Sequence, residues 1–517
     1  MNDSSWSVFV VLCVLVSFIV VGLRQKSRES LEYGFGGRYT GRIGGGAAIA
    51  SNWMSAASLM GLAGVIYLQG YQALAYVIGW TGGYVLLLVL LASQIRRFGK
   101  FTAPDFVGER YGSSLARLMA AVISIAISVI YCVAQFKGIG LIFSFMFGID
   151  YSRGVLFGGV AVVSYLVLSG MLGVPRNQQM LYFVIIVSFI VPLMWLAHRL
   201  GYFWLLPQFG YGEAIGDLSR SFNIDFTAPF AHGSLFNWCA LCFTLMVGTA
   251  GLPHVLSRFY TVPNIRDARW SVVWGLFFIA LIYWSAPAYA VFGRLLEARQ
   301  GAALTPEAAR SIADVIILKT VVLAGLPGWL VGVLAAGALS AAFFTVAGLL
   351  MTGAASISYD IYYSILNPAA SEAARMKVAK GGTLVLAALA LLLSLNPPGL
   401  IAEITAIAFA LAGNTIFPLF LLGIWWERAN RQGAIAGMLT GVICTFAEPL
   451  LGGILPGIAG WFPLTSSALC GAPLVVGVMI AVSLVTPAPP EEMRRFLAEE
   501  VHGHLDHDPA ETNSIKA

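Results

Sequence analysis

Residues 50–64, with the sequence ASNWMSAASLMGLAG, place polar and small side chains in the middle of an apolar run. The run extends from Gly46 to Gly70 and is long enough to cross a bilayer as a helix. The middle of the run carries the polar and aromatic side chains Ser51, Asn52, Trp53, Ser55 and Ser58. At this depth each unsatisfied backbone group costs several kcal/mol unless protein or a cavity meets it. The pattern is typical of a helix interface of small residues, or of a broken helix whose carbonyls and amides bind an ion and a solute.

A second apolar run, residues 233–256, contains a comparable interruption. Its segment GTAGLPH, residues 248–254, holds two glycines and a proline. Proline removes a backbone donor and glycine relaxes the helix, so we expect an unwound point near Gly248–Gly251. Four complete apolar runs lie between the starts of the two interrupted runs, which is the spacing expected for an inverted 5+5 repeat.

Lys137 is the residue that is most costly to bury, because it lies in the apolar segment VIYCVAQFKGIG, residues 129–140, beside Gln135. An intramembrane lysine usually faces a cavity or a partner and is a functional candidate. Lysine can also extend its ammonium to the membrane surface while its stem stays in the apolar region. The sequence leaves both interpretations open. Under the first, we predict that the ammonium attracts a solute carboxylate or replaces a bound cation electrostatically.

The composition indicates an integral membrane protein. The chain has 517 residues, of which 58% are hydrophobic and 11% are charged, whereas soluble domains carry about 25% charged residues. Basic residues are scattered among short loops, so we expect no nucleic-acid partner. No GxSxG, HExxH or P-loop motif occurs, which argues against a hydrolase or an ATP-driven pump and predicts that the protein is not an enzyme.

Thirteen apolar runs have spanning length, so we predict an all-α polytopic membrane protein with about 13 transmembrane spans. The runs are 6–23, 46–70, 71–94, 115–147, 152–174, 178–200, 233–256, 272–297, 327–362, 378–395, 399–423, 434–452 and 467–486. We expect a transmembrane domain at residues 1–486, with inverted repeats at about 46–200 and 233–423. Residues 487–517 are expected to form a mobile cytoplasmic tail.

The distribution of basic residues predicts the orientation. If the N-terminus is outside, the inner segments hold 22 of the 30 Lys and Arg residues and the outer segments hold seven. The positive-inside rule therefore predicts an outer N-terminus and a cytoplasmic C-terminus in a bacterial cytoplasmic membrane. Two outer loops are long, residues 201–232 and 298–325, and we expect a surface helix in the second after Thr305-Pro306.

Several longer segments resemble the sodium:solute symporter family, over roughly residues 6–450. RFGKFTAPDFVGERYG, residues 97–112, and FALAGNTIFPLFLLGIWWERANRQGAIAGMLTG, residues 409–441, resemble the two signatures of this family. GTAGLPHVLSRFYTVPNIRDARWS, residues 248–271, together with ASNWMSAAS, resembles its acetate and monocarboxylate permease branch. The resemblance implies a LeuT-like 5+5 inverted repeat with extra helices and secondary transport driven by an ion gradient.

The resemblance also implies where an ion and a solute bind. It places sodium against the carbonyls of Ser51 and Met54 and against helix-eight positions Ala341, Phe344 and Thr345. Many relatives have a hydroxyl residue where this chain has Phe344, so one oxygen ligand is missing. The residues expected to contact the solute are Asn52, Trp53, Ser55, Gln135, Lys137, Gly248 and Gly251.

The function predicted from the resemblance is cation-coupled symport of a small organic anion, such as acetate or another short monocarboxylate. Sodium is the expected coupling ion, with no other metal and no cofactor. The alternatives are a proton-coupled carrier and a non-transporting membrane sensor or receptor on the same scaffold. The expected partners are the solute and membrane lipid, and a small membrane subunit stays an open question.

Overall fold

The computed structural model describes residues 3–26, 46–47, 50–51, 53–98, 102–169, 173–231, 233–256, 265–301 and 305–501. Within these ranges the regular structure is helical and no strand occurs, which confirms the predicted all-α class. The long helices are α1 (Asp3–Lys26), α4 (Leu74–Leu90), α7 (Ser114–Phe147), α8 (Tyr151–Ser169), α9 (Gly173–Leu200), α11 (Leu235–Gly251), α13 (Ile265–Arg299), α16 (Gly328–Ala355), α17 (Glu372–Ser394), α18 (Ile401–Asn414), α20 (Arg431–Thr445) and α23 (Ala468–Val485).

The other helices, most of them shorter, connect or extend these. They are α3 (Leu62–Gln69), α5 (Ala92–Phe98), α6 (Ala103–Arg110), α10 (Pro207–Phe222), α12 (Pro253–Leu256), α14 (Pro306–Ala313), α15 (Ile316–Leu323), α19 (Ile416–Trp425), α21 (Ala447–Leu451), α22 (Pro456–Ala459) and α24 (Glu491–Phe496). Four helical turns of other pitch complete them. They are the 3-10 turn η2 (Gly70–Ala73) and the π-helical segments η1 (Ala57–Gly61), η4 (Ser356–Leu366) and η5 (Leu497–Val501).

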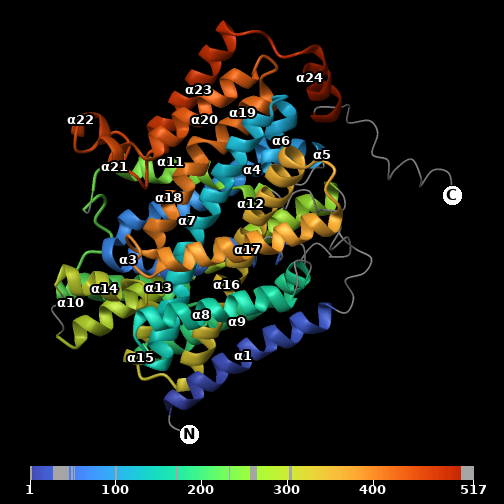
Figure 1. Ribbon diagram of the computed structural model, residues 1–517. Helices are drawn as coiled ribbons and strands as arrows, with labels where there is room; N and C mark the ends of the chain where they lie inside the picture. The colour runs from blue at the N-terminus through green and yellow to red at the C-terminus, as the bar shows by residue number, and fades with distance from the viewer. Residues whose placement is uncertain are drawn as a thin grey trace.

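Helices α7 and α16 form the centre of the bundle. They contact each other, α7 also contacts α8 and α18, and α1 and α9 pack against α16 (Figure 1). In the most apolar stretch of α16 and η4, 94% of the residues are buried, whereas in that of α17 only 28% are buried. Small residues along α16 allow this close packing, since van der Waals contact holds helices together where lipid tails are as apolar as the side chains.

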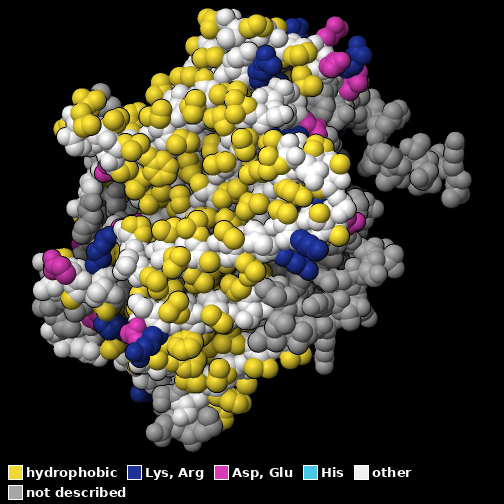
Figure 2. Space-filling view, viewed as in Figure 1, with side chains coloured by type: hydrophobic (Ala, Val, Ile, Leu, Met, Phe, Trp, Pro, Cys, Tyr) yellow, Lys and Arg dark blue, Asp and Glu magenta, His cyan; other side chains and the backbone are white. Residues whose placement is uncertain are grey.

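The outer surface is that of a membrane protein. Among the described residues, eight helical segments are long and apolar enough to cross a membrane by length and composition. Figure 2 shows hydrophobic side chains over the middle of the visible face, with charged side chains mostly toward its left and right edges, near α14 and α24. The number of about 13 spans stays a prediction.

Both predicted helix interruptions occur. Met54 and Ser55 have no regular structure, and a helical residue precedes them and another follows before η1 begins. In the second run, α11 ends at Gly251, and Leu252 has an extended backbone with φ −68° and ψ 119°. Pro253 then begins α12, where the missing N–H is not needed. The apolar runs at residues 46–70 and 233–256 are therefore broken helices.

The two long connections differ in how well the sequence predicts them. The expected surface helix is α14, and the Thr305 hydroxyl caps it by accepting the Ala308 N–H at 3.3 Å. The segment 201–232, predicted only as a long loop, contains α10, which packs against α13. The glycines and aromatic residues of this segment have low helix propensity, so the sequence does not predict the helix. Its stability comes from packing on α13.

The first part of the predicted tail is helical and packs against the membrane domain. Residues after Pro490 form α24 and η5, and η5 contacts α5. Leu497 and Val501 are buried in this contact. The apolar residues of a charged segment thus anchor it to the membrane domain. The remainder of the tail, residues 502–517, lies outside the described residues.

Candidate ion and solute site

Serine side chains satisfy the backbone around the first break. The Ser55 hydroxyl accepts the N–H of Ser58 at 3.2 Å and lies 3.3 Å from the Ser58 hydroxyl. The Ser58 hydroxyl donates to the Trp53 carbonyl at 3.2 Å. Short hydroxyl side chains reach backbone groups a few residues away, so they replace helical partners that unwinding removes. All three residues are buried, where an unpaired backbone group is costly.

Gln135 of α7 faces the same break. Its Oε1 accepts the N–H of Ala56, directly after the break, at 2.8 Å. The side chain is fully buried, and its Nε2 has no hydrogen-bond partner in the part of the chain that the structure describes. The Ala56 contact determines the orientation of the amide, because a backbone N–H pairs only with Oε1. A buried donor thus remains at the break that the described residues leave unused.

Aromatic rings surround the break. The Trp53 indole Nε1 donates to the Tyr283 hydroxyl at 2.6 Å. The Trp53 ring lies 5.5 Å from that of Tyr84 and 6.3 Å from that of Phe409, centroid to centroid. Tyr131 also packs on Phe409, at 5.8 Å. Only Trp53 was predicted, because the other rings come from α4, α7, α13 and α18 and only the fold brings them together.

Tyr131 connects the two broken helices. Its hydroxyl donates to the Ser55 hydroxyl at 3.4 Å, and its ring meets the His254 imidazole edge to face at 5.7 Å. His254 lies on α12, just beyond the second break. This titratable residue is not among the site residues predicted from the sequence. The available signal was a histidine directly after the proline of an interrupted span.

Two of the residues expected to bind sodium are in direct contact. The Thr345 hydroxyl donates to the Met54 carbonyl at 3.1 Å, so α16 meets the first break at this carbonyl. Ser51 and Ala341, the other two expected ligands, are fully buried. Thr345 and Met54 thus bring oxygen atoms of both helices together in a buried environment.

Phe344 packs away from this contact, toward α8. Its ring is buried and lies edge to face with Tyr165 at 6.3 Å. The hydroxyl of Ser340, one turn earlier, donates to the Ala336 carbonyl at 2.6 Å within its own helix. Neither side chain therefore supplies the oxygen that Thr345 supplies.

Gly248 and Gly251 allow α11 to approach α18 closely. A Cβ atom on Gly248 would lie 2.4 Å from the Phe409 carbonyl oxygen, and one on Gly251 would lie 2.6 Å from that of Ala412. Real Cβ atoms do not approach backbone so closely. The two glycines thus determine the position of α18, and with it the Phe409 ring beside Trp53.

Lys137 binds a carboxylate of the protein rather than presenting its charge to the break. Its Nζ forms an ion pair with Asp314 at 2.5 Å and donates to the Gly399 carbonyl at 2.7 Å. It follows Gln135 by two positions, which directs the two side chains to different faces of α7. Asn52, also expected at the solute, lies outside the described residues.

Comparison with known proteins identifies the family. The sodium:solute symporter family model matches residues 33–441. An uncharacterized symporter of Cupriavidus necator is 31% identical, with 94% of this chain and 92% of the relative covered. The monocarboxylic acid transporter of Corynebacterium glutamicum is 29% identical, with 90% of this chain and 89% of the relative covered.

Solved structures show the same fold. A Na+-coupled sialic acid symporter in a substrate-bound outward-open state has a TM-score of 0.75 at 15% identity, covering 94% of this chain and 99% of that chain. MhsT in complex with L-phenylalanine has a TM-score of 0.52 at 14% identity, covering 86% of this chain and 99% of that chain. The LeuT-like helical fold is therefore present, and the family and the fold are those of membrane transporters. The chain belongs to the sodium:solute symporter family.

Proposed function

We propose that this protein carries a small organic anion across the bacterial cytoplasmic membrane together with sodium. The observation that carries the proposal is the contact of the Thr345 hydroxyl with the Met54 carbonyl, because it joins the oxygen atoms of α16 to those of the first break. Sodium is a hard cation, and hard cations prefer oxygen ligands. Membership in a family of sodium-coupled symporters supports the same coupling.

The sodium ligands that we propose are the carbonyls of Ser51, Met54 and Ala341 and the hydroxyl of Thr345. Phe344 adds no oxygen, and its ring packs against Tyr165. The site then has fewer protein ligands than a site with two adjacent hydroxyl residues. We therefore expect weaker sodium binding than in relatives that have both.

A short monocarboxylate fits the chemistry at the first break. The start of the helix after the break carries a partial positive charge, which favours anions. Gln135 adds a buried amide donor at this helix start. The rings of Trp53 and Phe409 offer an apolar wall for a short alkyl group. The 29% identity to a monocarboxylic acid transporter supports this solute class.

The test is uptake of labelled acetate, propionate and pyruvate into proteoliposomes, with sodium and pH gradients imposed separately. We expect uptake of at least one of them to follow an inward sodium gradient and to be absent from empty liposomes. Saturable binding without uptake under any gradient would favour the sensor alternative. Uptake of neutral analogues but of no carboxylate would contradict the solute class.

A proton-coupled carrier is the second candidate, and His254 favours it. Its imidazole lies beside Tyr131, whose hydroxyl reaches Ser55 at the first break. A histidine changes charge in the physiological pH range and can carry a proton between the two broken helices. If uptake ignores sodium, follows a pH gradient and is lost in His254→Gln, this candidate replaces sodium coupling.

A further inference from the structure

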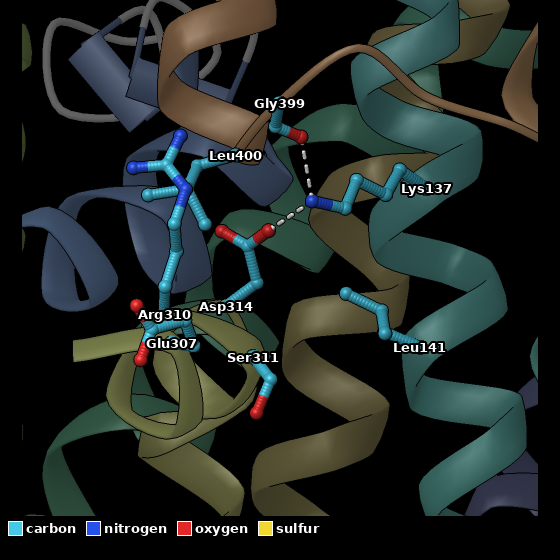
Figure 3. Close-up of a pocket in the computed structure, with 8 residues that line it drawn as sticks. All are labelled: Lys137, Leu141, Glu307, Arg310, Ser311, Asp314, Gly399 and Leu400. Carbon is cyan, nitrogen blue, oxygen red and sulfur yellow. Dashed lines mark hydrogen bonds and ion pairs between the residues drawn. The ribbon is translucent and has the colours of Figure 1, made fainter. Parts of the chain in front are cut away.

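A buried ion pair joins three elements at the end of the molecule that carries α14. Lys137 reaches from α7 to Asp314, which lies in the connection between α14 and α15 (Figure 3). Both carboxylate oxygens of Asp314 accept the N–H of Ile401, the first residue of α18, at 3.2 Å. The Lys137 ammonium also donates to the Gly399 carbonyl, just before α18. Lys137, Asp314 and the Ile401 N–H are called the clasp below.

A second ion pair beside the clasp has a different environment. Arg310 of α14 and Glu403 of α18 are 2.6 Å apart, and Glu403 also accepts the Leu400 N–H at 2.9 Å. The Arg310 side chain is 52% exposed, whereas the side chains of Lys137 and Asp314 are 13% and 4% exposed. Exposed pairs contribute little, so Arg310 is a matched control for the buried pair.

Lys137 and Asp314 of the clasp line an open pocket. The pocket has a volume of about 370 Å³ and is lined by Lys137, Leu141, Glu307, Arg310, Ser311, Asp314, Gly399 and Leu400. Leu400 is only 4% exposed although it lines the pocket. The packed side chains below the pocket therefore close this end of the molecule.

The backbone beside the clasp packs against the broken helix that forms the candidate site. A Cβ atom on Gly64 of α3 would lie 2.6 Å from the Ala313 carbonyl oxygen, and one on Gly61 would lie 2.9 Å from the Ala402 N. The segment after the first break thus packs directly against the backbone on both sides of the clasp. Movement of α14 and of the start of α18 would uncover this segment.

We propose that the clasp closes this end of the protein over the solute site, with Lys137 as the counter-charge that allows Asp314 to be buried, and that the two charges separate into water when this end opens. A buried ion pair loses hydration and gains attraction in nearly equal amounts, so separating both charges costs little. Burying one charge alone is costly. The inference rests on the proposed transport function, since a carrier must alternate between closed and open ends.

The electrostatics of Asp314 agree with this assignment. Burial raises the pKa of the Asp314 carboxyl, while the Lys137 ammonium lowers it and the Glu403 carboxylate raises it. Arg310 and Glu307 of α14 are the other charged groups around the pocket. Because a hydrated carboxyl has the lower pKa, the closed form binds a proton more tightly than the open form. Lower pH therefore favours closure, most strongly where Lys137 is missing.

The experiment measures how fast a maleimide labels Leu400→Cys in purified protein in detergent, which makes the membrane orientation irrelevant. Cys13 and Cys239, the exposed cysteines, are replaced by serine in the parent. We expect Lys137→Met to raise the labelling rate about tenfold or more, since Asp314 is then buried alone only at a cost. Adding Asp314→Asn to Lys137→Met should restore the slow rate.

Two controls keep the proposal testable. Arg310→Met should leave the rate unchanged, and Lys137→Arg should stay close to the parent because the charge is kept. In Lys137→Met, lowering the pH should slow labelling relative to an exposed cysteine such as Ser311→Cys.

Equal labelling rates of the parent and Lys137→Met, with both proteins folded by their thermal transitions, would contradict the proposed role of the clasp. An equal increase of the labelling rate in Arg310→Met would also contradict it. Labelling needs no solute, so this result is independent of the uptake test.

Discussion

Gln135 uses one end of its amide within the protein, and we propose that the other end binds the solute. Its Oε1 replaces a helical carbonyl for the Ala56 N–H, while its Nε2 is buried without a partner among the described residues. A donor of this kind contributes about 1.5–3 kcal/mol when its partner is charged. Lys137, two positions away, has its charge satisfied by Asp314. We therefore propose that neutral Gln135, and not Lys137, recognises the carboxylate of the proposed solute.

Gln135→Glu tests this role. Glutamate keeps an oxygen for the Ala56 N–H but replaces the Nε2 donor with a second oxygen, so its ionised form repels a carboxylate. We expect the KM for carboxylate uptake to rise at least about tenfold, which corresponds to about 1.4 kcal/mol. Ser340→Ala, on a hydroxyl bonded within α16, should leave KM unchanged. An unchanged KM in Gln135→Glu would remove Gln135 from the solute site.

Thr345 and its neighbour test the sodium site. Thr345→Val has nearly the same shape but no oxygen, so we expect a higher sodium concentration for half-maximal uptake. Phe344→Ser adds a hydroxyl at the position where many relatives have one, and should lower that concentration. Sodium titration of initial uptake rates measures both changes. If both variants have the sodium dependence of the unmodified protein, the ion does not bind here.

At the scale of elements, the two segments that resemble the family signatures bind each other. Arg110 of α6 is fully buried and donates to the carbonyls of Gly423, Trp426 and Ala429, at 2.6, 3.1 and 3.2 Å. These carbonyls lie at and beyond the end of α19, where a helix leaves its last carbonyls without partners. The guanidinium satisfies them and holds α6 on the bundle. The two signature segments thus form one packing contact, between α6 and the end of α19, which are distant in the sequence.

Close approach of α11 to α18 is a second property of elements, and Gly248→Ala tests it. The added methyl would lie 2.4 Å from the Phe409 carbonyl oxygen, so one helix must shift. Overpacking of this kind costs about 1–3 kcal/mol, and we expect a lower thermal transition and slower uptake. Gly477→Ala is the matched control, because its methyl meets open space on α23 and alanine favours the helix. Equal stability of the two variants would contradict tight α11–α18 packing.

At the scale of the whole molecule, orientation and span number remain predictions from charge and apolar length. The basic residues predict an outer N-terminus and a cytoplasmic C-terminus. Reporter fusions after Arg42, Asn223 and Arg431 should read inside, outside and inside. The second fusion follows Asn223 because this residue ends α10, whose interruption would disturb packing. The reverse pattern would invert the topology and place the clasp on the cytoplasmic side.

The sequence alone determined the all-α membrane class and the positions of both broken helices. The physical reason is local. In lipid a helix pairs all of its own backbone N–H and C=O groups, so polar, small or proline residues within an apolar run of spanning length mark where this pairing is interrupted. The same local logic predicted the Thr305 cap of α14. It also identified Trp53, Ser55 and Gln135 beside the first break, because they lie in or near the interrupted pattern.

The tertiary structure decided which partners these residues have. Sequence established that burying Lys137 is costly, but the compensating Asp314 lies 177 positions away in a connection between two short helices. The rings of Tyr84, Tyr283 and Phe409 belong to three different helices and have no sequence pattern that joins them to the break. The cost of burying a group depends on its own chemistry, so sequence reveals it. Its compensation depends on the packing of distant elements, which only the folded chain supplies.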